Sequence, residues 1–364
     1  MRDGFIMTKK KLIEIGSHQM SQWDEFVLHH PYGWFCQLSG WKDVLENSFQ
    51  HIKGHFLAIL DEESNKIEAG LPIYEVRSWL TGTRLVSVPF GTLCDPLISS
   101  SGEIELLNRR VLELYDQCKA SYIEIRSFFS SDLIQNEEFG HCCFFKHHYI
   151  PLDSDPEKVK KSFHRTCVRQ RISRALKSDL ELKVGSDLSD LREFYELYSL
   201  TRKRNGVPVQ PYRFFRSLWE IFGPSNNLVL LLSLHKENAV AGIILFKFKQ
   251  QVSAEFAASN ITEFQQISPN HLLFWEAIKS ACLEGYKVFD FGRTSPNNKS
   301  LMDFKRRWGT EVVDLPQFFY PKSATDSVLR REERWQFKTI EKLCKVMPAP
   351  FVQVLGDFCY RHMG

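Results

Sequence analysis

The 364-residue sequence has no long apolar runs. No stretch approaches the roughly 18 consecutive apolar residues that a membrane-spanning helix needs, and the first twenty residues contain no apolar run of signal-peptide length. The nine cysteines are irregularly spaced and include no Cys-x-x-Cys pair, unlike the cysteines of a disulfide framework. These absences predict a cytoplasmic protein whose cysteines are reduced thiols.

Several catalytic motifs are also missing. The sequence contains no Gly-x-x-x-x-Gly-Lys-Ser/Thr loop, no Gly-x-Gly-x-x-Gly turn after a strand and no Gly-x-Ser-x-Gly elbow, which disfavours nucleotide hydrolysis and serine hydrolase chemistry. Residues 141–148, HCCFFKHH, gather cysteines and histidines, but their spacing fits no usual zinc arrangement. We therefore predict no metal site.

A duplicated pattern organises the chain. A length of 364 residues favours two domains, and the same order of hairpin, strand, helix and strand occurs twice. Ala69 corresponds to Ala241, 172 positions later, and Glu124 corresponds to Asp290, 166 positions later. The paired segments are 55–76 with 228–248, 84–90 with 251–259, 103–120 with 269–285, and 121–127 with 286–295.

The pattern predicts an α/β fold with mixed sheets, in two related domains. The first domain covers residues 1–150, and the second covers 151–322 with a helical insertion at about 155–222. The insertion holds a helix at about 155–178, another at 188–203 and a third after Pro211; a helical tail follows at 323–364. Ser268 is expected to cap the helix that Pro269 opens and Gly285 ends.

The net charge of +3 conceals a strong local excess. Residues 156–177 contain eight Lys or Arg and one acid, a local charge of +7, so the remainder carries about −4. On one continuous helix the stripe Lys158, Lys161, Arg165 and Arg169 would face away from the apolar residues Val159, Phe163, Val168 and Ile172. Such a stripe fits an anionic ligand, for example a diphosphate, a lipid-linked sugar phosphate or RNA. A solvated surface helix is the alternative.

Candidate chemistry lies at the end of the second copy. Asp290 and Arg293 stand at the carboxyl end of a strand, where ligands bind in open sheets, and Lys305 follows between aromatic residues. These groups could stabilise developing negative charge or orient an amine, although Asp290 and Arg293 could equally form a structural ion pair.

A second group of candidates lies in the first copy. Gln37 and Trp41 are one helical turn apart, and Asp95 follows a Pro-Phe-Gly turn that is either a ligand loop or an ordinary turn.

Five segments carry a resemblance to a known family: FCQLSGW, LVSVPFGTLCDP, FHRTCVRQRISRALKSDLEL, TRKRNGVPVQP and FDFGRTSPNNKSLMDFKRRWGTE. With the duplication, they make residues 20–322 resemble tandem GNAT-type acyltransferase domains. The pair is similar to the Fem family of peptidoglycan-bridge aminoacyl transferases and to FemAB-like relatives of exopolysaccharide and exosortase systems. The last segment, with its Asp, Gly-Arg-Thr, Phe-Lys and Trp-Gly, is the most specific.

The resemblance implies transfer of an activated amino acid from tRNA to an amine of a cell-wall precursor, without a metal or redox cofactor. The family's Phe-Lys motif falls on Phe304 and Lys305, which implies that Lys305 steadies the acyl-transfer intermediate or the leaving group. Phe90, Gly91 and Thr92 replace the family's Arg-Gly-Pro, with Asp95 as the nearby acid. Residues 258–271 contain no glycine, unlike the pyrophosphate loop of CoA-dependent GNAT enzymes.

The resulting prediction is a Fem-like N-acyl or aminoacyl transferase acting on a cell-envelope or exopolysaccharide precursor. The alternatives are an acyl-CoA-dependent N-acyltransferase of amino sugars and a non-catalytic module that binds RNA or an envelope complex. The donor is aminoacyl-tRNA or acyl-CoA, no cofactor is bound tightly, and DNA is not expected as a partner.

The tail either rests on an anionic membrane surface or packs on the protein. The predicted site residues are Lys305, Asp290 and Asp95 as catalytic groups, and Gln37, Trp41, Arg165, Arg169 and Arg293 as binding groups.

Overall fold

The structure is a computed structural model that describes residues 10–134, 138–260, 266–329 and 335–363. The chain divides into two compact units, which are described separately here. The first unit contains Met1–Cys142, Pro316–Leu329 and His362–Gly364; the second contains Cys143–Leu315 and Arg330–Arg361. In the part of the chain that is described, no helix is both long enough and apolar enough to span a bilayer.

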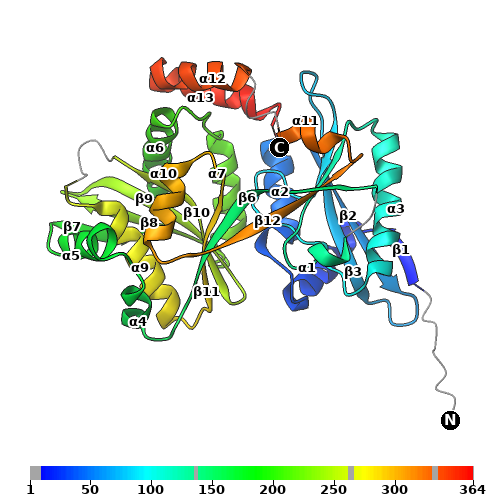
Figure 1. Cartoon of the computed structure of the whole chain (residues 1–364), viewed down its shortest axis with the longest axis horizontal. Coiled ribbons are helices and arrows are strands. Elements are labelled where there is room, and N and C mark those ends of the chain that lie inside the picture. Colours follow the sequence, from blue (N-terminus) through cyan, green and yellow to red (C-terminus); the bar gives the residue numbers. More distant parts are fainter. Residues whose placement is uncertain (1–9, 135–137, 261–265, 330–334, 364) are drawn as a thin grey trace, which may run out of the picture. The chain divides into compact units, whose positions relative to one another are not determined.

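The first unit contains a sheet in the order β1-β2-β3-β4-β5-β12 (Figure 1). Strands β4 and β5 pair in parallel, and the other strand pairings described within this sheet are antiparallel. Its strands are β1 (Lys10–Glu14), β2 (Ile52–Asp61), β3 (Ile67–Val76), β4 (Arg84–Val86), β5 (Ile123–Arg126) and the last residues of β12 (Glu311–Tyr320). Its helices are α1 (Met20–His29), α2 (Ser39–Ser48), α3 (Ser101–Gln117) and α11 (Ala324–Leu329). Ser100 and Glu103 form a capping box that starts α3.

The second unit contains a sheet in the order β6-β11-β10-β9-β8-β7, whose strands are labelled in Figure 1. Only β10 and β11 pair in parallel. Its strands are β6 (Gly140–Pro151), β7 (Leu180–Val184), β8 (Leu228–His235), β9 (Asn238–Phe248), β10 (Gln251–Ser259) and β11 (Val288–Thr294). Its helices are α4 (Pro156–Lys161), α5 (Gln170–Ala175), α6 (Leu188–Arg204), α7 (Tyr212–Phe222), α9 (Pro269–Leu283), α10 (Lys299–Arg307), α12 (Trp335–Val346) and α13 (Ala349–Tyr360).

The two units repeat one topology, as the sequence pattern predicts. The hairpin β2–β3 corresponds to β8–β9, strand β4 to β10, helix α3 to α9, and strand β5 to β11. The parallel registers match as well, because Val86 pairs with Glu124 in the first unit and Ser253 pairs with Asp290 in the second. Glu124 and Asp290 therefore occupy equivalent positions at the ends of equivalent strands.

The unit boundaries differ from the predicted limits at 150 and 322. Lys146–Pro151 of β6 pair with β11, and the second unit begins at Cys143 rather than at residue 151. Gln317 to Tyr320 of β12 pair with β5, so this later segment completes the sheet of the first unit. Hydrogen bonds between strands distant in sequence set both limits, and no composition change marks them.

The basic segment is not the single helix that we expected. Helix α4 ends at Lys161, a π-helical turn covers Arg165–Arg169, and α5 follows. The break lies where the His164 amide donates to the Arg307 carbonyl oxygen at 2.8 Å, outside any helical ladder. The prediction of one continuous basic stripe is therefore wrong. The apolar face is confirmed, since Val159, Phe163, Val168 and Ile172 are buried.

The ends of α9 bear out two of three sequence expectations. Gly285, with φ of 86°, follows the helix and supplies the left-handed conformation that ends it. Ser268 was expected to cap the first turn with its side chain, but it makes no such hydrogen bond and itself adopts φ of 59°. Pro269 occupies the first helical position as expected.

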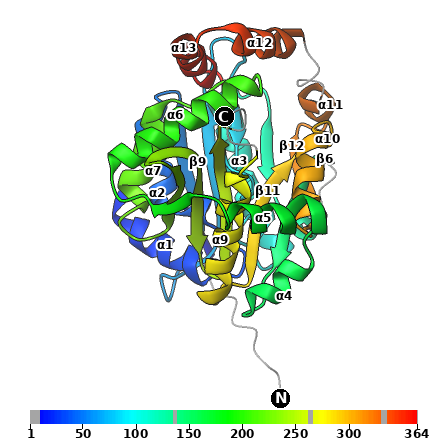
Figure 2. The same cartoon turned by 90° about the vertical axis from the view of Figure 1, so that its left-hand side faces the viewer.

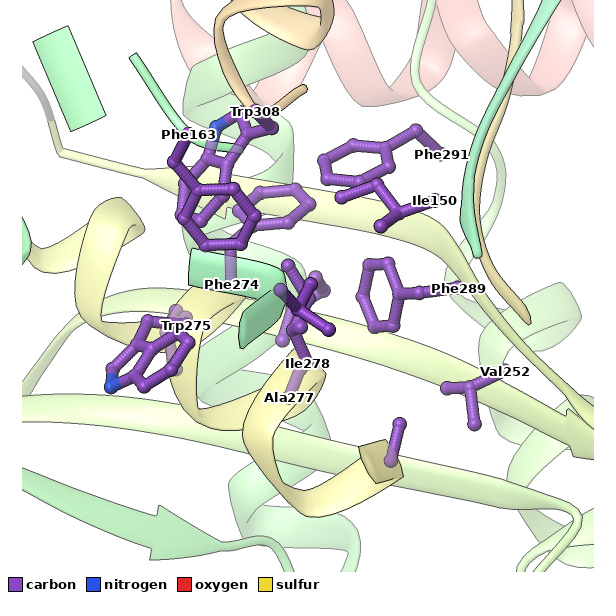
Figure 3. Packing of buried hydrophobic residues seen from close by; sticks show 14 of the residues in the cluster. Ile150, Phe163, Val252, Phe274, Trp275, Ala277, Ile278, Phe289, Phe291 and Trp308 are labelled. Carbon is purple, nitrogen blue, oxygen red and sulfur yellow. The ribbon is translucent and has the colours of Figure 1, made fainter. Parts of the chain in front are cut away.

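The core of the second unit lies between α9 and the sheet (Figure 3). Phe274 of α9 stacks on Phe291 of β11 with centroids 5.3 Å apart, and Phe289 contacts Phe291 at 5.3 Å. Trp308, fully buried, packs against Phe274 and Phe163. This cluster fixes the strand that carries Asp290 against the helix that begins at Pro269.

We predict that Phe289→Ala lowers the free energy of unfolding by about 3–5 kcal/mol, because a fully buried aromatic side chain leaves a cavity. Urea unfolding followed by far-UV circular dichroism measures the change. Leu283→Ala is the control: Leu283 is 66% exposed, so its truncation should change stability by less than about 0.5 kcal/mol. Equal effects of both substitutions would contradict the assigned core.

Candidate functional site

Strands β10 and β11 begin as neighbours and then stop pairing. Their parallel register covers only Gln251–Ser253 against Val288–Asp290, although the strands continue to Ser259 and Thr294. Directly after this register, the pairing of each strand with its other neighbour is irregular: between Ala254 and Phe256 for β10, and between Asp290 and Gly292 for β11. Such bulges bend a strand and redirect its side chains. The bulges thus set Glu255 and Asp290 at the point of divergence.

Lys305 of α10 is bound at this point. Its Nζ donates to the carbonyl oxygens of Gly292 and Arg293, both at 3.0 Å. The residue is only 6% exposed, and burial lowers the pKa of its ammonium to about 8. The negative charges of Asp290 and Glu255 act in the opposite direction and favour the protonated form. The result is a desolvated cation beside two carboxylates.

Asp290 is held by several donors. One carboxylate oxygen accepts from the Gly292 amide at 2.6 Å, and the other accepts from Nε2 of Gln251 at 2.9 Å. Nε2 of His147 lies 3.3 Å from the same carboxylate. The guanidinium of Arg293 lies over the ring of Phe145, 4.6 Å from its centroid. The charges of Asp290 and Arg293, which lie on the same strand, both act on Lys305.

Glu255 is a site residue that the sequence analysis missed. It lies at the bulge of β10, its carboxylate accepts from Oγ of Ser253 at 2.6 Å, and burial raises its pKa to about 7. Asp290 raises this pKa further, whereas Lys305 lowers it. A carboxyl with a pKa near 7 can accept or release a proton at neutral pH. The sequence feature that could have indicated Glu255 is the single acidic residue in the apolar strand sequence QVSAEFAAS.

The basic segment borders the first turn of α9. Nη1 of Arg174 donates to the Gln266 carbonyl oxygen at 3.3 Å. Burial, together with the charge of Arg171, lowers the pKa of His271 in this turn to about 4. Free amides and the helix dipole make a helix start favourable for anions. Arg171 and Arg174 therefore both act near this positive end.

The two predicted arginines of the segment have different surroundings. Arg165 is exposed on the π-helical turn. Nε of Arg169 is buried and has no hydrogen-bond partner among the described residues. Their assignment to ligand binding stays a prediction.

In the first unit, Gln37 and Asp95 are joined in one buried network. Oδ1 of Asp95 accepts from Oγ of Ser127 and the Phe128 amide, both at 2.8 Å, and from the Ser130 amide at 2.9 Å. Nε2 of Gln37 donates to the Asp95 carbonyl oxygen. Burial raises the pKa of Asp95. These contacts fix the loop, and a catalytic role of Asp95 stays a prediction.

Trp41, the other predicted residue of this region, is 1% exposed in α2 and packs edge-on against Phe35. Its aromatic ring therefore belongs to the core of the first unit.

In the first unit, the side chain of Arg126 occupies the strand end that corresponds to Asp290. Nε of Arg126 donates to Glu124 at 2.6 Å, and its Nη1 donates to the carbonyl oxygens of Val88 at 2.9 Å and Gly91 at 2.7 Å. Gln317 donates to the same Glu124 oxygen at 3.0 Å. In the first unit this arginine thus holds the turn before Asp95. At the equivalent strand end of the second unit, a lysine is bound beside two carboxylates.

Comparisons with known proteins agree with this geometry. Residues 162–306 match the family of acetyltransferase (GNAT) domains. This match covers less than half of the chain and shows what that region is similar to. The matched region includes Glu255, Asp290, Arg293 and Lys305, and it confirms the prediction of an acyltransferase-type domain. The site found from the geometry therefore lies inside the matched domain.

The chain is also similar to a curated protein, the lipid II:glycine glycyltransferase of Staphylococcus haemolyticus (strain JCSC1435). The two are 25% identical over 150 residues, which are 39% of this chain and 35% of that protein. The match thus spans about a third of the relative's length.

Solved structures show that the fold is a tandem GNAT fold. FemX superposes with a TM-score of 0.70 at 17% identity, covering 88% of this chain and all of that chain. A tandem GNAT protein from the clavulanic acid biosynthesis pathway gives a TM-score of 0.53 at 8% identity, covering 86% of this chain and 99% of that chain. The predicted fold class and the resemblance to Fem proteins are confirmed.

We predict that stability rises from pH 8 to pH 10 relative to the variant Lys305→Met. Burial depresses the pKa of Lys305 to about 8 from its usual 10.5, so in this window the folded protein binds fewer protons than the unfolded chain. Folding is then favoured by on the order of 1 kcal/mol per pH unit. Urea unfolding of both proteins at several pH values measures the difference. A difference that is constant with pH would contradict the buried ammonium.

Proposed function

We propose that the protein is an N-acyltransferase that passes an aminoacyl group to a primary amine of a cell-envelope precursor. The observation that carries the proposal is the buried Lys305 ammonium at the point where β10 and β11 diverge. The similarity to a lipid II:glycine glycyltransferase supports this substrate class. The reaction site is the group Lys305, Glu255, Asp290 and Arg293 in the second unit.

Lys305 supplies positive charge where the reaction develops negative charge. When an amine attacks an acyl ester, the carbonyl oxygen becomes an oxyanion, and a prepositioned cation in a desolvated site stabilises it strongly. A pKa of about 8 keeps this ammonium mainly protonated at neutral pH, while the Gly292 and Arg293 carbonyl oxygens fix its position. Asp290 acts as a positioning residue, because its charge favours the protonated lysine.

Glu255 is suited to take the proton that the amine loses. With a pKa of about 7, a substantial fraction is ionised at neutral pH. The balanced step forms the C–N bond, breaks the ester C–O bond, moves the amine proton to Glu255 and places a proton from Lys305 on the leaving oxygen. No covalent enzyme intermediate or further reactant is required, since alignment of the two substrates supplies much of the acceleration.

The donor in this proposal is an aminoacyl-tRNA. The +7 segment places Arg171 and Arg174 beside the positive end of α9, which favours a polyanion. The glycine-free region 258–271 lacks the residues of a usual CoA pyrophosphate loop, although residues 261–265 lie outside the described part of the chain. Acyl-CoA transfer to an amino sugar remains the alternative that the donor experiment below distinguishes.

The first unit is proposed to bind the acceptor rather than to catalyse transfer. At the strand end equivalent to Asp290, the Arg126 guanidinium is engaged by Glu124 and two loop carbonyl oxygens. Arg126, held in this way, fixes the loop that contains Asp95. It supplies no ammonium group to a reacting carbonyl.

We predict that Lys305→Met lowers turnover by about 100- to 1000-fold, because the charge that stabilises the oxyanion is lost. Transfer of radiolabelled glycine, alanine or serine from aminoacyl-tRNA to a lipid-linked muropeptide measures it. Lys299→Met, an exposed lysine at the start of the same helix, is the control and should keep wild-type turnover. Unchanged turnover in both Lys305→Met and Arg293→Ala would overturn the site assignment.

We predict that the double variant Arg171→Glu, Arg174→Glu weakens donor binding at least about tenfold at 0.1 M salt, with a smaller loss at higher salt. Titration with aminoacyl-tRNA and, separately, with acetyl-CoA measures the effect. The matched control reverses two exposed arginines of α6 and α7, Arg192→Glu and Arg216→Glu. Arginine-dependent affinity for acetyl-CoA with none for tRNA would replace the tRNA donor by CoA.

A further inference from the structure

Helices α12 and α13 expose large apolar side chains. Val346 is 77% exposed, Val354 is 69% exposed and Phe351 is 58% exposed. Leu343 at 42% and Phe358 at 48% extend the set. Scattered exposed apolar residues are common on protein surfaces, but a contiguous group on adjacent helices marks an interaction surface. We call these five residues the tail face.

The tail face is one side of each helix. Phe351, Val354 and Phe358 recur at the three- and four-residue spacing of one face of α13, and Leu343 and Val346 do so on α12. The other side of α13 is buried at Val352 and Gly356. A Cβ at Gly356 would lie 2.2 Å from the Val209 carbonyl oxygen, so the backbone of α13 packs directly on the unit. The helices are thus docked, and their apolar outer sides are left exposed.

Both helices dock on the same element. In Figures 1 and 2 they lie together next to α6, and both contact α6. Nη2 of Arg202 in α6 donates to the Tyr360 hydroxyl of α13 at 3.2 Å. Cys344 of α12 is fully buried. Both helices therefore pack on the same element of the second unit while their large apolar side chains on the other sides stay exposed.

The charge around the tail face is positive. Residues 327–364 contain seven Lys or Arg and four acids, which is a local net charge of +3. Within the described part of the tail, both acids are already in ion pairs: Glu341 with Lys345 at 2.6 Å, and Asp357 with Arg361 at 2.9 Å. Asp357 also pairs with Arg213 of α7 at 2.6 Å. The uncompensated charge next to the apolar residues is therefore cationic, and Lys342 is exposed within it.

We propose that the tail face is a docking surface for an anionic lipid bilayer. An apolar helix face with basic residues beside it lies in the headgroup region, where the apolar side chains leave water and the cations meet anionic headgroups. A second copy of this chain is disfavoured as the occupant, because a symmetric contact would set two basic surfaces against each other. This inference does not rest on the proposed transfer reaction.

The experiment is cosedimentation of the full chain with vesicles. We expect binding to vesicles of phosphatidylcholine with about 30% phosphatidylglycerol, and much weaker binding to pure phosphatidylcholine, because anionic lipids attract the basic tail. The triple variant Val346→Ser, Phe351→Ser, Val354→Ser should reduce the binding constant at least about tenfold. All three side chains are exposed, so the variant should keep the wild-type circular dichroism spectrum.

The matched control removes exposed apolar groups elsewhere in the second unit. Leu182→Ser, Val184→Ser alters β7, where these residues are 44% and 65% exposed, and should leave vesicle binding unchanged. Absence of wild-type binding to either vesicle, or equal losses in the two variants, would overturn the proposal. A concentration-dependent dimer in light scattering that the triple variant abolishes, without vesicle binding, would assign the surface to a second copy instead. Loss of aminoacyl transfer with vesicle binding retained would count only against the proposed function.

Discussion

The ammonium of Lys305 is removed from water and bound by two backbone carbonyl oxygens, and the site of the second unit depends on this contact. The carbonyl oxygens are available because β11 has a bulge after Asp290, where Gly292 adopts φ of 69°, a conformation that glycine accepts readily. The aromatic core of Phe274, Phe291, Phe304 and Trp308 excludes solvent around α10. Desolvation lowers the pKa of the lysine and raises that of Glu255, so the pKa values of both groups lie near neutral pH.

The duplication shows how one topology supports two outcomes. Equivalent strands end in Glu124 and in Asp290, with matching parallel registers. In the first unit Arg126 lies two residues along the strand, close enough to bind both the carboxylate and the neighbouring turn. In the second unit the cation comes from a separate helix, and a second carboxylate at the bulge of β10 faces it. The source of the cation thus distinguishes the two strand ends: an arginine of the same strand in the first unit, and a lysine of a separate helix in the second.

Much of this could be predicted from the sequence, because periodicity and turn residues act locally. The repeated hairpins, the helices α6, α7 and α9 and the burial of Val159 and Phe163 follow from apolar spacing. Lys305 and Asp290 were predicted from a motif and from a strand end. The π-helical turn at Arg165–Arg169 was not, because its cause is a hydrogen bond from His164 to Arg307, far along the chain. Glu255 was missed because it lies at a bulge, which has no sequence signature of its own.

The sequence by itself determined the duplicated αβ topology, the apolar core and the charge of the +7 segment and the basic tail, because these properties depend on residue type and spacing alone. Only the tertiary structure decided which of two equivalent strand ends holds a desolvated lysine, which segments complete each sheet, and which side of α13 is exposed. These properties depend on contacts between residues distant in the chain, and the free energies of desolvation and hydrogen bonding that govern them exist only after the chain has folded.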